Sequence, residues 1–478
     1  MFCRRIFQPL KAVKSPTAAA KDWEKYPSWN SIIMGSMNWK TWLMIGIFML
    51  VGAFLLGWQM APRVEGIQPA AGQLRGRLPL QLSFTRAMDP NSVESALTLD
   101  PRIEGDFSWD EEDRTLTFTP ELVWPSGSTV KLELGRGVRS KFRLPLLGGS
   151  QAAWDVRPIS LVYLWPADGV SNLYQVNPET GDSQTLTDLT AGVLDYSISL
   201  ERDRIYYSTP RQAGGSLILV LDPVSGETSQ VLECSQGFCT APQLSADGDL
   251  LAYEYLSREE GVQPGVQILE LASGVVTDLG APDQYLEKQL WSPAGWLAVY
   301  NQTAKGYQFW NPRTDETTFI PNETGGDGSW SPDGRYFLSS EIVFVSDTLA
   351  PRHLMLIDLV EETIQDLSRG SFLEDLNPRF APLGNRFAFS RKSLNPEEWT
   401  PGRQLWVMDQ ESETAFPLTD EVDYQHTSFA WHPDGEFLAF VRYNQAALSD
   451  PPEIWLIEAS GENPLRLIIN GFAPGWIP

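Results

Sequence analysis

The second half of the chain repeats one pattern, in which an apolar strand, a tight turn and a second apolar strand follow one another. The copies, the last of which is degenerate, begin at Gln243, Leu290, Ser329, Arg379, Ala430 and Tyr196. The turns contain glycines at intervals of 39 to 51 residues: Gly248, Gly295, Gly334, Gly384 and Gly435. A period of this length is typical of arrays in which each unit buries its apolar face against a neighbour.

Each unit continues with a third and a fourth apolar segment, and four strands in about 40 to 50 residues are typical of a β-propeller blade. Six full units run from about residue 194 to residue 469. Three further strand-like segments precede them, near Leu161, Leu173 and Gln184, and one follows at 470–478. Pairing these remnants would complete another blade without exposed sheet edges. We therefore expect an all-β fold with a propeller over 159–478, with seven blades favoured over six.

The turn residues of the repeat are expected to be structural rather than catalytic. Proline presets one turn dihedral, and glycine adopts a positive φ at little cost. The residues concerned are Asp247, Gly248, Gly295, Asp333, Gly334, Gly384, Asp434 and Gly435. The aromatic residues before the turns are expected to fill the gaps between blades: Trp291, Trp330 and Trp431.

Three copies of the repeat, Ser331-Pro-Asp-Gly, His432-Pro-Asp-Gly and Ser292-Pro-Ala-Gly, resemble the WSPDG-type (PD40) repeats of TolB-like β-propellers. The resemblance covers roughly the last 320 residues. It implies a propeller that commonly has six blades and binds protein partners in the cell envelope.

Residues 66–156 alternate apolar and polar positions in short segments, as two-sheet sandwiches do. Such segments include Leu80/Leu82/Phe84 and Phe142/Leu144, and both are expected to be strands. The stretches LQLSFTRAMDPNSVESALTLDP and FSWDEEDRTLTFTPELVWPSGSTVKLEL resemble bacterial Ig-like domains of cell-envelope proteins, which implies a spacer or a binding module. The acidic run 110–113 is interpreted as a solvated turn rather than a calcium site.

The N-terminal part differs from the rest in charge. Residues 1–40 have a local charge of +5, whereas the chain as a whole has a net charge of -25, which makes nucleic acid an improbable partner. No charged residue lies between Lys40 and Arg63, and the apolar run Trp42–Trp58 could cross a hydrocarbon layer of about 30 Å.

We expect a cytoplasmic basic segment at 1–38 and an uncleaved transmembrane helix at 39–60, with the later domains outside the cytoplasm. A cleaved signal peptide is the alternative, but the 40-residue leader is too long for one. Outside the cytoplasm, Cys234 and Cys239 could oxidise to a local disulfide; two free thiols are the alternative. Few histidines and cysteines are present, so neither a metal nor another cofactor is expected.

The sequence contains no G-x-S-x-G, H-E-x-x-H, P-loop or G-x-G-x-x-G motif, which favours a binding protein over an enzyme. Three long loops are expected on one face of the propeller: 257–264, 392–403 and 443–452. Within the second loop Trp399 is the candidate anchor for a partner, with Glu397, Glu398 and Arg403 beside it. The alternative is that the loop folds the Trp399 side chain onto the blade beneath.

We therefore expect a membrane-anchored extracytoplasmic scaffold that binds a protein or a cell-wall polymer. The alternatives are a carboxylate-based glycan hydrolase or lyase in the propeller channel, and an envelope sensor or assembly factor.

Overall fold

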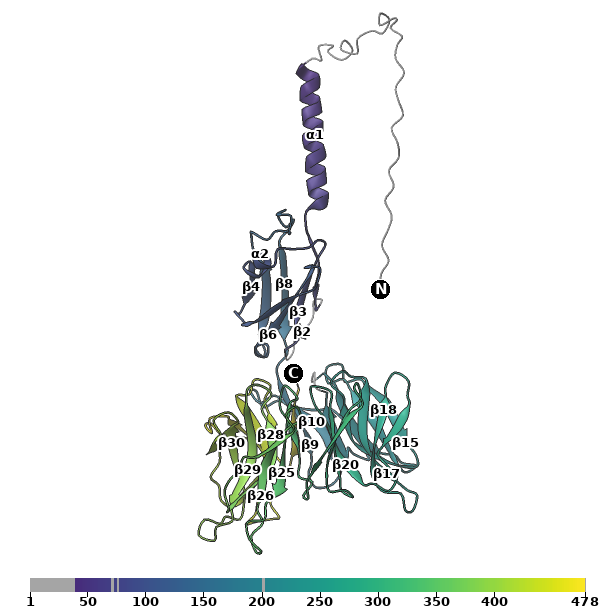
Figure 1. Cartoon of the computed structure of the whole chain (residues 1–478), viewed down its shortest axis with the longest axis vertical. Helices are drawn as coiled ribbons and strands as arrows, with labels where there is room; N and C mark the ends of the chain where they lie inside the picture. Colours follow the sequence, from purple (N-terminus) through teal and green to yellow (C-terminus); the bar gives the residue numbers. More distant parts are fainter. Residues whose placement is uncertain (1–38, 70–72, 75–76, 200–202, 478) are drawn as a thin grey trace, which may run out of the picture. The chain divides into compact units, whose positions relative to one another are not determined.

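The computed structural model describes residues 39–69, 73–74, 77–199 and 203–477, so the predicted basic segment 1–38 lies outside the described residues. The chain divides into two units, Met1–Ala61 and Pro62–Pro478. Helix α1 (Trp39–Met60) belongs to the first unit (Figure 1). Among the described residues, no helix is long and apolar enough to cross a membrane. The transmembrane helix predicted at 39–60 is therefore not confirmed.

The second unit begins with a β-sandwich of two four-stranded sheets. One sheet contains β1 (Val64–Gln68), β3 (Leu80–Phe84), β6 (Thr115–Pro120) and β5 (Gly105–Trp109). The other contains β2 (Gln73–Leu74), β8 (Ser150–Val156), β7 (Thr129–Leu134) and β4 (Leu97–Asp100). The short helix α2 (Pro90–Glu94) precedes β4.

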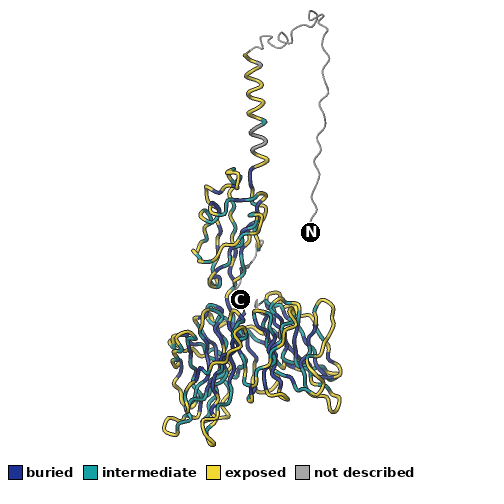
Figure 2. Tube along the Cα trace, viewed as in Figure 1, coloured by how far each residue is buried: buried dark blue, intermediate teal, exposed yellow. Residues whose placement is uncertain are grey.

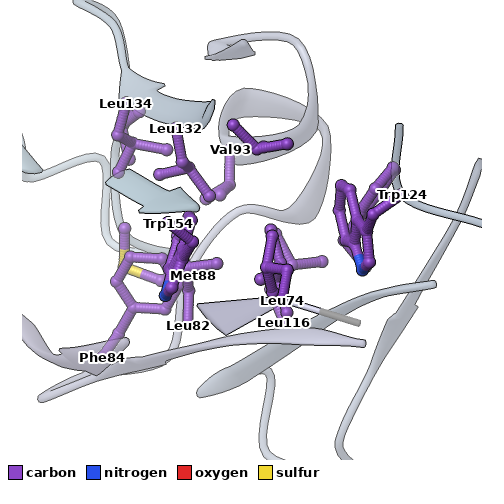
Figure 3. Close-up of a cluster of buried hydrophobic side chains, with 14 of the residues drawn as sticks. Leu74, Leu82, Phe84, Met88, Val93, Leu116, Trp124, Leu132, Leu134 and Trp154 are labelled. Atoms are coloured by element: carbon purple, nitrogen blue, oxygen red, sulfur yellow. The ribbon is translucent and has the colours of Figure 1, made fainter. Parts of the chain in front are cut away.

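The alternating apolar residues of both sheets meet in one core (Figure 3). Leu82, Leu116, Leu132 and Trp154 are almost completely buried there. The Trp154 indole nitrogen donates a hydrogen bond to the carbonyl oxygen of Pro69 at 2.9 Å, so the ring is buried without an unpaired polar group.

The predicted strand at Phe142/Leu144 is wrong. Arg143 has a left-handed φ of 61°, and its amide donates to the carbonyl oxygen of Ser140 at 2.8 Å, which closes a turn. Alternation over so few residues cannot distinguish a strand from a turn, because a strand also needs a partner edge.

Seven four-stranded sheets follow between Ser160 and Ile477. The first contains β9 (Ser160–Trp165), β10 (Asn172–Val176), β11 (Ser183–Thr185) and β36 (Phe472–Ile477). The next two contain β12 (Asp195–Ile198), β13 (Ile205–Pro210), β14 (Ser216–Leu221) and β15 (Thr228–Cys234), and then β16 (Gly237–Leu244), β17 (Leu250–Ser257), β18 (Gly265–Glu270) and β19 (Val276–Leu279).

The fourth and fifth sheets contain β20 (Leu286–Trp291), β21 (Leu297–Asn301), β22 (Gly306–Asn311) and β23 (Glu316–Pro321), and then β24 (Ser329–Trp330), β25 (Tyr336–Ile342), β26 (Arg352–Asp358) and β27 (Thr363–Asp366). The last two contain β28 (Leu373–Phe380), β29 (Arg386–Ser393), β30 (Gln404–Asp409) and β31 (Thr414–Pro417), and then β32 (Tyr424–Trp431), β33 (Phe437–Asn444), β34 (Glu453–Glu458) and β35 (Leu465–Ile469).

Each of these sheets is a meander of antiparallel strands except where β36 joins the first sheet. There the strand from the C-terminal end pairs with β9, with Trp476 opposite Leu161. The sheets stand side by side in Figure 1, and their buried residues concentrate along the strands in Figure 2.

Tryptophans of edge strands connect successive sheets. Trp330 Nε1 donates to the carbonyl oxygen of Leu290 at 3.0 Å, and Trp476 Nε1 donates to that of Ala430 at 2.9 Å. Both rings are almost fully buried. Each indole therefore packs between two sheets and also bonds to the backbone of the earlier one.

The five turn glycines all have a positive φ, between 72° and 86°. In the turn around Gly334, the Asp333 carboxylate accepts hydrogen bonds from the Ser331 hydroxyl at 2.5 Å and from the Arg335 amide at 3.0 Å. Asp247 accepts from Ser245 at 2.6 Å in the same way. Each of these carboxylates thus accepts a hydrogen bond within its own turn.

Candidate functional site

Large apolar side chains are exposed on the loops at one end of three successive sheets. In an antiparallel meander, the loops between second and third strands lie at the same end as the connections to the next sheet. We call this end of the β24–β27, β28–β31 and β32–β35 sheets the rim; it contains loops 343–351, 394–403 and 445–452 and connections 367–372 and 418–423. Its exposed large apolar side chains are Phe344, Val345, Phe372, Trp399, Val422 and Leu448. Phe344 and Leu448 are 77% and 80% exposed.

Trp399 lies on the loop after β29, at the rim. The side chain is 55% exposed, and the ammonium of Lys392 lies 4.2 Å from the ring centroid. The backbone around it is held by the amide of Glu397, which donates to Asn395 Oδ1 at 3.2 Å. Glu398 accepts a hydrogen bond from Ser393 Oγ at 3.0 Å. Trp399 and Glu397 thus lie at the surface on an ordered turn.

Arg403 has a different environment from these neighbours. Its guanidinium forms an ion pair with Glu374 of β28, and Nη1 lies 3.4 Å from Gln425 Oε1 of β32. The backbone oxygen of Arg403 also accepts from the amide of His426 at 3.0 Å. The structure therefore places Arg403 beneath the loop, where it joins two sheets, and not beside the exposed face of Trp399.

A buried ion pair supports the Trp399 loop. Arg391 bonds to both carboxylate oxygens of Asp375 at 2.7 Å, and the Asp375 side chain is fully buried. The guanidinium of Arg391 lies 5.0 Å from the ring of Trp406. Ser368 Oγ donates to the same carboxylate at 2.6 Å. Asp375 is therefore fully engaged, as a buried charge must be.

The next sheet repeats this arrangement. Arg442 lies between the rings of Tyr424 and Trp455, at 4.1 Å and 3.9 Å, and bonds to Glu453 and Glu421 at 2.8 Å each. Sequence reasoning missed both arginines. The signal was the repeated Ala-Phe-x-Arg at 388–391 and 439–442, followed in each case by a tryptophan in the third strand.

Acidic side chains lie toward the same end of two earlier sheets and of the β24–β27 sheet. Burial raises the pKa values of Asp195, Glu254 and Glu341 above their usual range, although hydrogen bonds to each carboxylate partly oppose this. Glu254 accepts the amide of Lys288 at 2.9 Å, and Lys288 Nζ lies 3.2 Å from Asp327. Among the described residues, no group of three or more histidine, cysteine or acidic residues could hold a metal ion.

The remaining predicted residues lie elsewhere. Cys234 and Cys239 are joined by a disulfide, with 6.0 Å between their Cα atoms. It links β15 to β16, the first strand of the next sheet. In the acidic run 110–113, Asp110 Oδ1 accepts the amides of Arg114 and Thr115 at 2.7 Å and 3.1 Å, as in a closed turn.

Comparisons with known proteins support the two recognised parts. Residues 59–154 match the bacterial Ig-like domain family, whereas no curated protein matches the chain. TolB from Acinetobacter baumannii is similar over 80% of this chain and 83% of its own, with 12% identity and a TM-score of 0.43. The β-propeller domain of the trilobed protease from Pyrococcus furiosus is similar over 72% and 95%, with 11% identity and a TM-score of 0.48.

A third similar structure corrects the prediction that the chain is not an enzyme. Dipeptidyl peptidase 4 from Porphyromonas gingivalis is similar over 71% of this chain and 50% of its own, with 12% identity and a TM-score of 0.43. The prediction that the chain is not an enzyme rested on the absence of known catalytic motifs. It is wrong, because peptidases are among the matching structures. Residues 59–154 are thus a bacterial Ig-like domain, and the sheets that follow have structural neighbours in TolB and other β-propeller proteins.

Proposed function

We propose that this chain is a cell-envelope scaffold whose rim binds a protein partner. The observation that supports the proposal is the exposure of Phe344, Trp399 and Leu448 on three successive sheets. Large aromatic and aliphatic side chains in this arrangement are typical of interface anchors. We assign one blade of a seven-bladed propeller to each of the seven sheets, so the rim spans three adjacent blades.

The supporting side chains make this surface suitable for binding. Arg391 and Arg442 hold strands that flank loops 394–403 and 445–452, so a partner would meet ordered loops there. Binding to an ordered surface avoids part of the entropy cost of association. The net charge of -25 favours a partner that presents both cations and apolar side chains.

Site-specific photocrosslinking in native membranes tests the rim. A photoreactive residue at Trp399 or Leu448 should crosslink to the same envelope protein, and one at Val360 should not. Val360 is a suitable control because it is 71% exposed but lies in the turn between β26 and β27, at the opposite end of its sheet. If the rim crosslinked only to glycan strands, the partner would be a wall polymer and the proposed protein partner would be refuted. Equal crosslinking at Val360 would refute the rim.

We also propose that α1 attaches the chain to a membrane, with the domains after it outside the cytoplasm. Its described apolar side chains are exposed along the helix, including Phe48, Met49 and Leu50 at 71% or more. Exposed apolar area of this extent is costly in water and favourable in lipid. The full chain should resist alkaline extraction from membranes, and deletion of 39–60 should release it. Protease added outside cells or spheroplasts should then cleave the propeller of the undeleted chain.

A second candidate is a carboxylate-based hydrolase or lyase that acts on glycans. The raised pKa of Asp195 and Glu254 favours it, since a raised pKa makes a carboxyl group better suited to act as a general acid. Release of new sugar ends from purified wall polysaccharide should then be lost in Asp195→Asn and Glu254→Gln. Equal, background-level release by all three proteins would refute this candidate.

A further inference from the structure

One loop of the Ig-like domain differs in charge from the acidic chain around it. Residues 135–149 contain four cations and no carboxylate, whereas the whole chain has a net charge of -25. The cations are Arg136, Arg139, Lys141 and Arg143. The loop lines a hollow of about 710 Å³, whose wall contains the three arginines and also Glu133 of β7.

The tip of this loop presents a single aromatic ring. Phe142 is 84% exposed and lies between Lys141 and Arg143 in sequence. The turn holds it in place, because Ser140 Oγ accepts the amide of Leu144 at 3.2 Å and Ser140 itself is buried. An apolar ring held outward between two cations is unfavourable in water, and burial in an apolar layer would stabilise it.

Two of the four cations already have partners. Arg139 pairs with Asp89 at 3.0 Å, and Lys141 pairs with Asp113. Among the described residues, neither Arg136 nor Arg143 forms an ion pair with a carboxylate. These two guanidinium groups are therefore available for an external anion.

The loop is tied to the residues that directly follow α1. The amide of Leu147 donates to the carbonyl oxygen of Pro62 at 2.9 Å. Pro62 is two positions after Met60, the last residue of α1. A chain extends by at most about 3.6 Å per residue, so this anchoring point lies within about 7 Å of the end of α1.

We infer that loop 135–149 is a docking surface for anionic lipid headgroups. Arg136 and Arg143 bind headgroup phosphates, and Phe142 enters the interfacial layer between them. Aromatic rings favour this layer because it is apolar on one side and wet on the other. The inference rests on the membrane attachment of α1 proposed above.

Fluorescence of an interfacial probe tests this docking. In a Cys3→Ser background, Phe142→Cys is labelled with nitrobenzoxadiazole, whose emission shifts to the blue and whose lifetime lengthens on leaving water. The full chain is reconstituted into vesicles of phosphatidylcholine alone or with phosphatidylglycerol added. Phe344→Cys is the matched control, because it is similarly exposed but lies on a propeller loop.

We expect a blue shift at position 142 in the anionic vesicles only, and none at position 344. Arg136→Gln and Arg143→Asn should each lower the ratio of docked to undocked label, taken from its two lifetimes, by about fivefold. Asparagine is chosen at 143 because it tolerates the left-handed backbone there. About 1 M NaCl, at which the Debye length is ~3 Å, should abolish the shift.

Four results would overturn the inference. The first is a label whose emission does not shift in anionic vesicles that carry the protein. The second and third are an emission shift of the same size in neutral vesicles, or with soluble polyphosphate and no lipid. The fourth is a ratio of docked to undocked label that is the same in both arginine variants as in the unsubstituted chain. In each of these cases the attachment of α1 would still stand, as flotation of the protein with the vesicles would show. Failure of the unlabelled chain to float in any vesicle would refute that attachment and the docking together.

Discussion

Trp431 donates its indole N–H to the carbonyl oxygen of Arg379, 2.9 Å away, and so joins the first strands of two successive sheets. The ring is almost fully buried between them. The same contact recurs at Trp291, Trp330 and Trp476 with the carbonyl oxygens of Gln243, Leu290 and Ala430. The sheets are therefore held to one another by a buried tryptophan ring and by the hydrogen bond that its indole N–H donates, and this pair of contacts recurs from sheet to sheet.

The Trp431 contact predicts a graded loss of stability. Trp431→Phe removes the hydrogen bond but retains most of the ring, so we expect the free energy of unfolding to fall by about 1–2 kcal/mol. Trp431→Ala also leaves a cavity and should cost about 3–5 kcal/mol. Urea unfolding of the detergent-solubilised chain, followed by tryptophan fluorescence, measures both. Trp399→Phe, at an exposed site, should change stability by less than about 0.5 kcal/mol.

The buried pair Asp375–Arg391 predicts a large effect when one charge is removed. Asp375→Asn leaves the Arg391 guanidinium buried without its counter-ion, at a cost of about 3–5 kcal/mol in unfolding free energy. Asp375→Leu combined with Arg391→Met should recover most of that loss. The exposed pair Asp247–Arg313 is the matched control: Arg313→Ala should cost no more than about 1 kcal/mol. Equal losses at the two sites would contradict this account.

The disulfide between Cys234 and Cys239 predicts a smaller loss. It closes a short loop, and the loss of chain entropy in the unfolded state corresponds to about 2 kcal/mol for a loop of this length. Thermal unfolding should therefore begin at a lower temperature when a reductant is present. The double variant Cys234→Ser/Cys239→Ser should have the same lowered midpoint and no response to reductant. A response to reductant in that variant would point to another cause.

Glu421 predicts a loss of stability in acid. The imidazole of His426, 3.6 Å away, and the Arg442 guanidinium, 2.8 Å away, hold the pKa of Glu421 below its usual value, although burial opposes them. Because the folded pKa is lowered, this contribution is fully present above the ordinary glutamate pKa of about 4.3. It is lost as the pH falls through the lower, folded value.

The test compares thermal midpoints of the wild type and Glu421→Gln between neutral and acidic pH. The variant should be less stable at neutral pH and should lose less stability on acidification, so the two curves should converge below about pH 4. Parallel curves at all pH values would show that the carboxylate of Glu421 has no part in the acid transition.

Local features of the sequence predicted local structure well. The turn glycines could be found because a positive φ is a property of single residues, and the structure has all five in that region. The pairing of the early strands with 470–478 followed from the need to cover sheet edges, and β9 and β36 are paired. The β-sandwich was predictable because its alternation of apolar residues sets which face is buried.

Contacts between distant residues were not predictable in this way. Arg403 was chosen as a neighbour of Trp399 in sequence, but Glu374 on another strand forms an ion pair with it. Which carboxylate an arginine meets depends on strand register and on the adjacent sheet, and neither is present in spacing alone. Trp399 could be selected because it is a large aromatic residue in a long loop between two predicted strands.

The pairing of β36 with β9 has a consequence for biosynthesis. Trp165 Nε1 bonds to the carbonyl oxygen of Ile469, 304 positions later, and β36 follows Ile469. During translation the edge of β9 stays unpaired until β36 has emerged from the ribosome. A chain interrupted before residue 472 would keep that edge available to other strands, which makes such a chain a substrate for aggregation or for quality-control proteases.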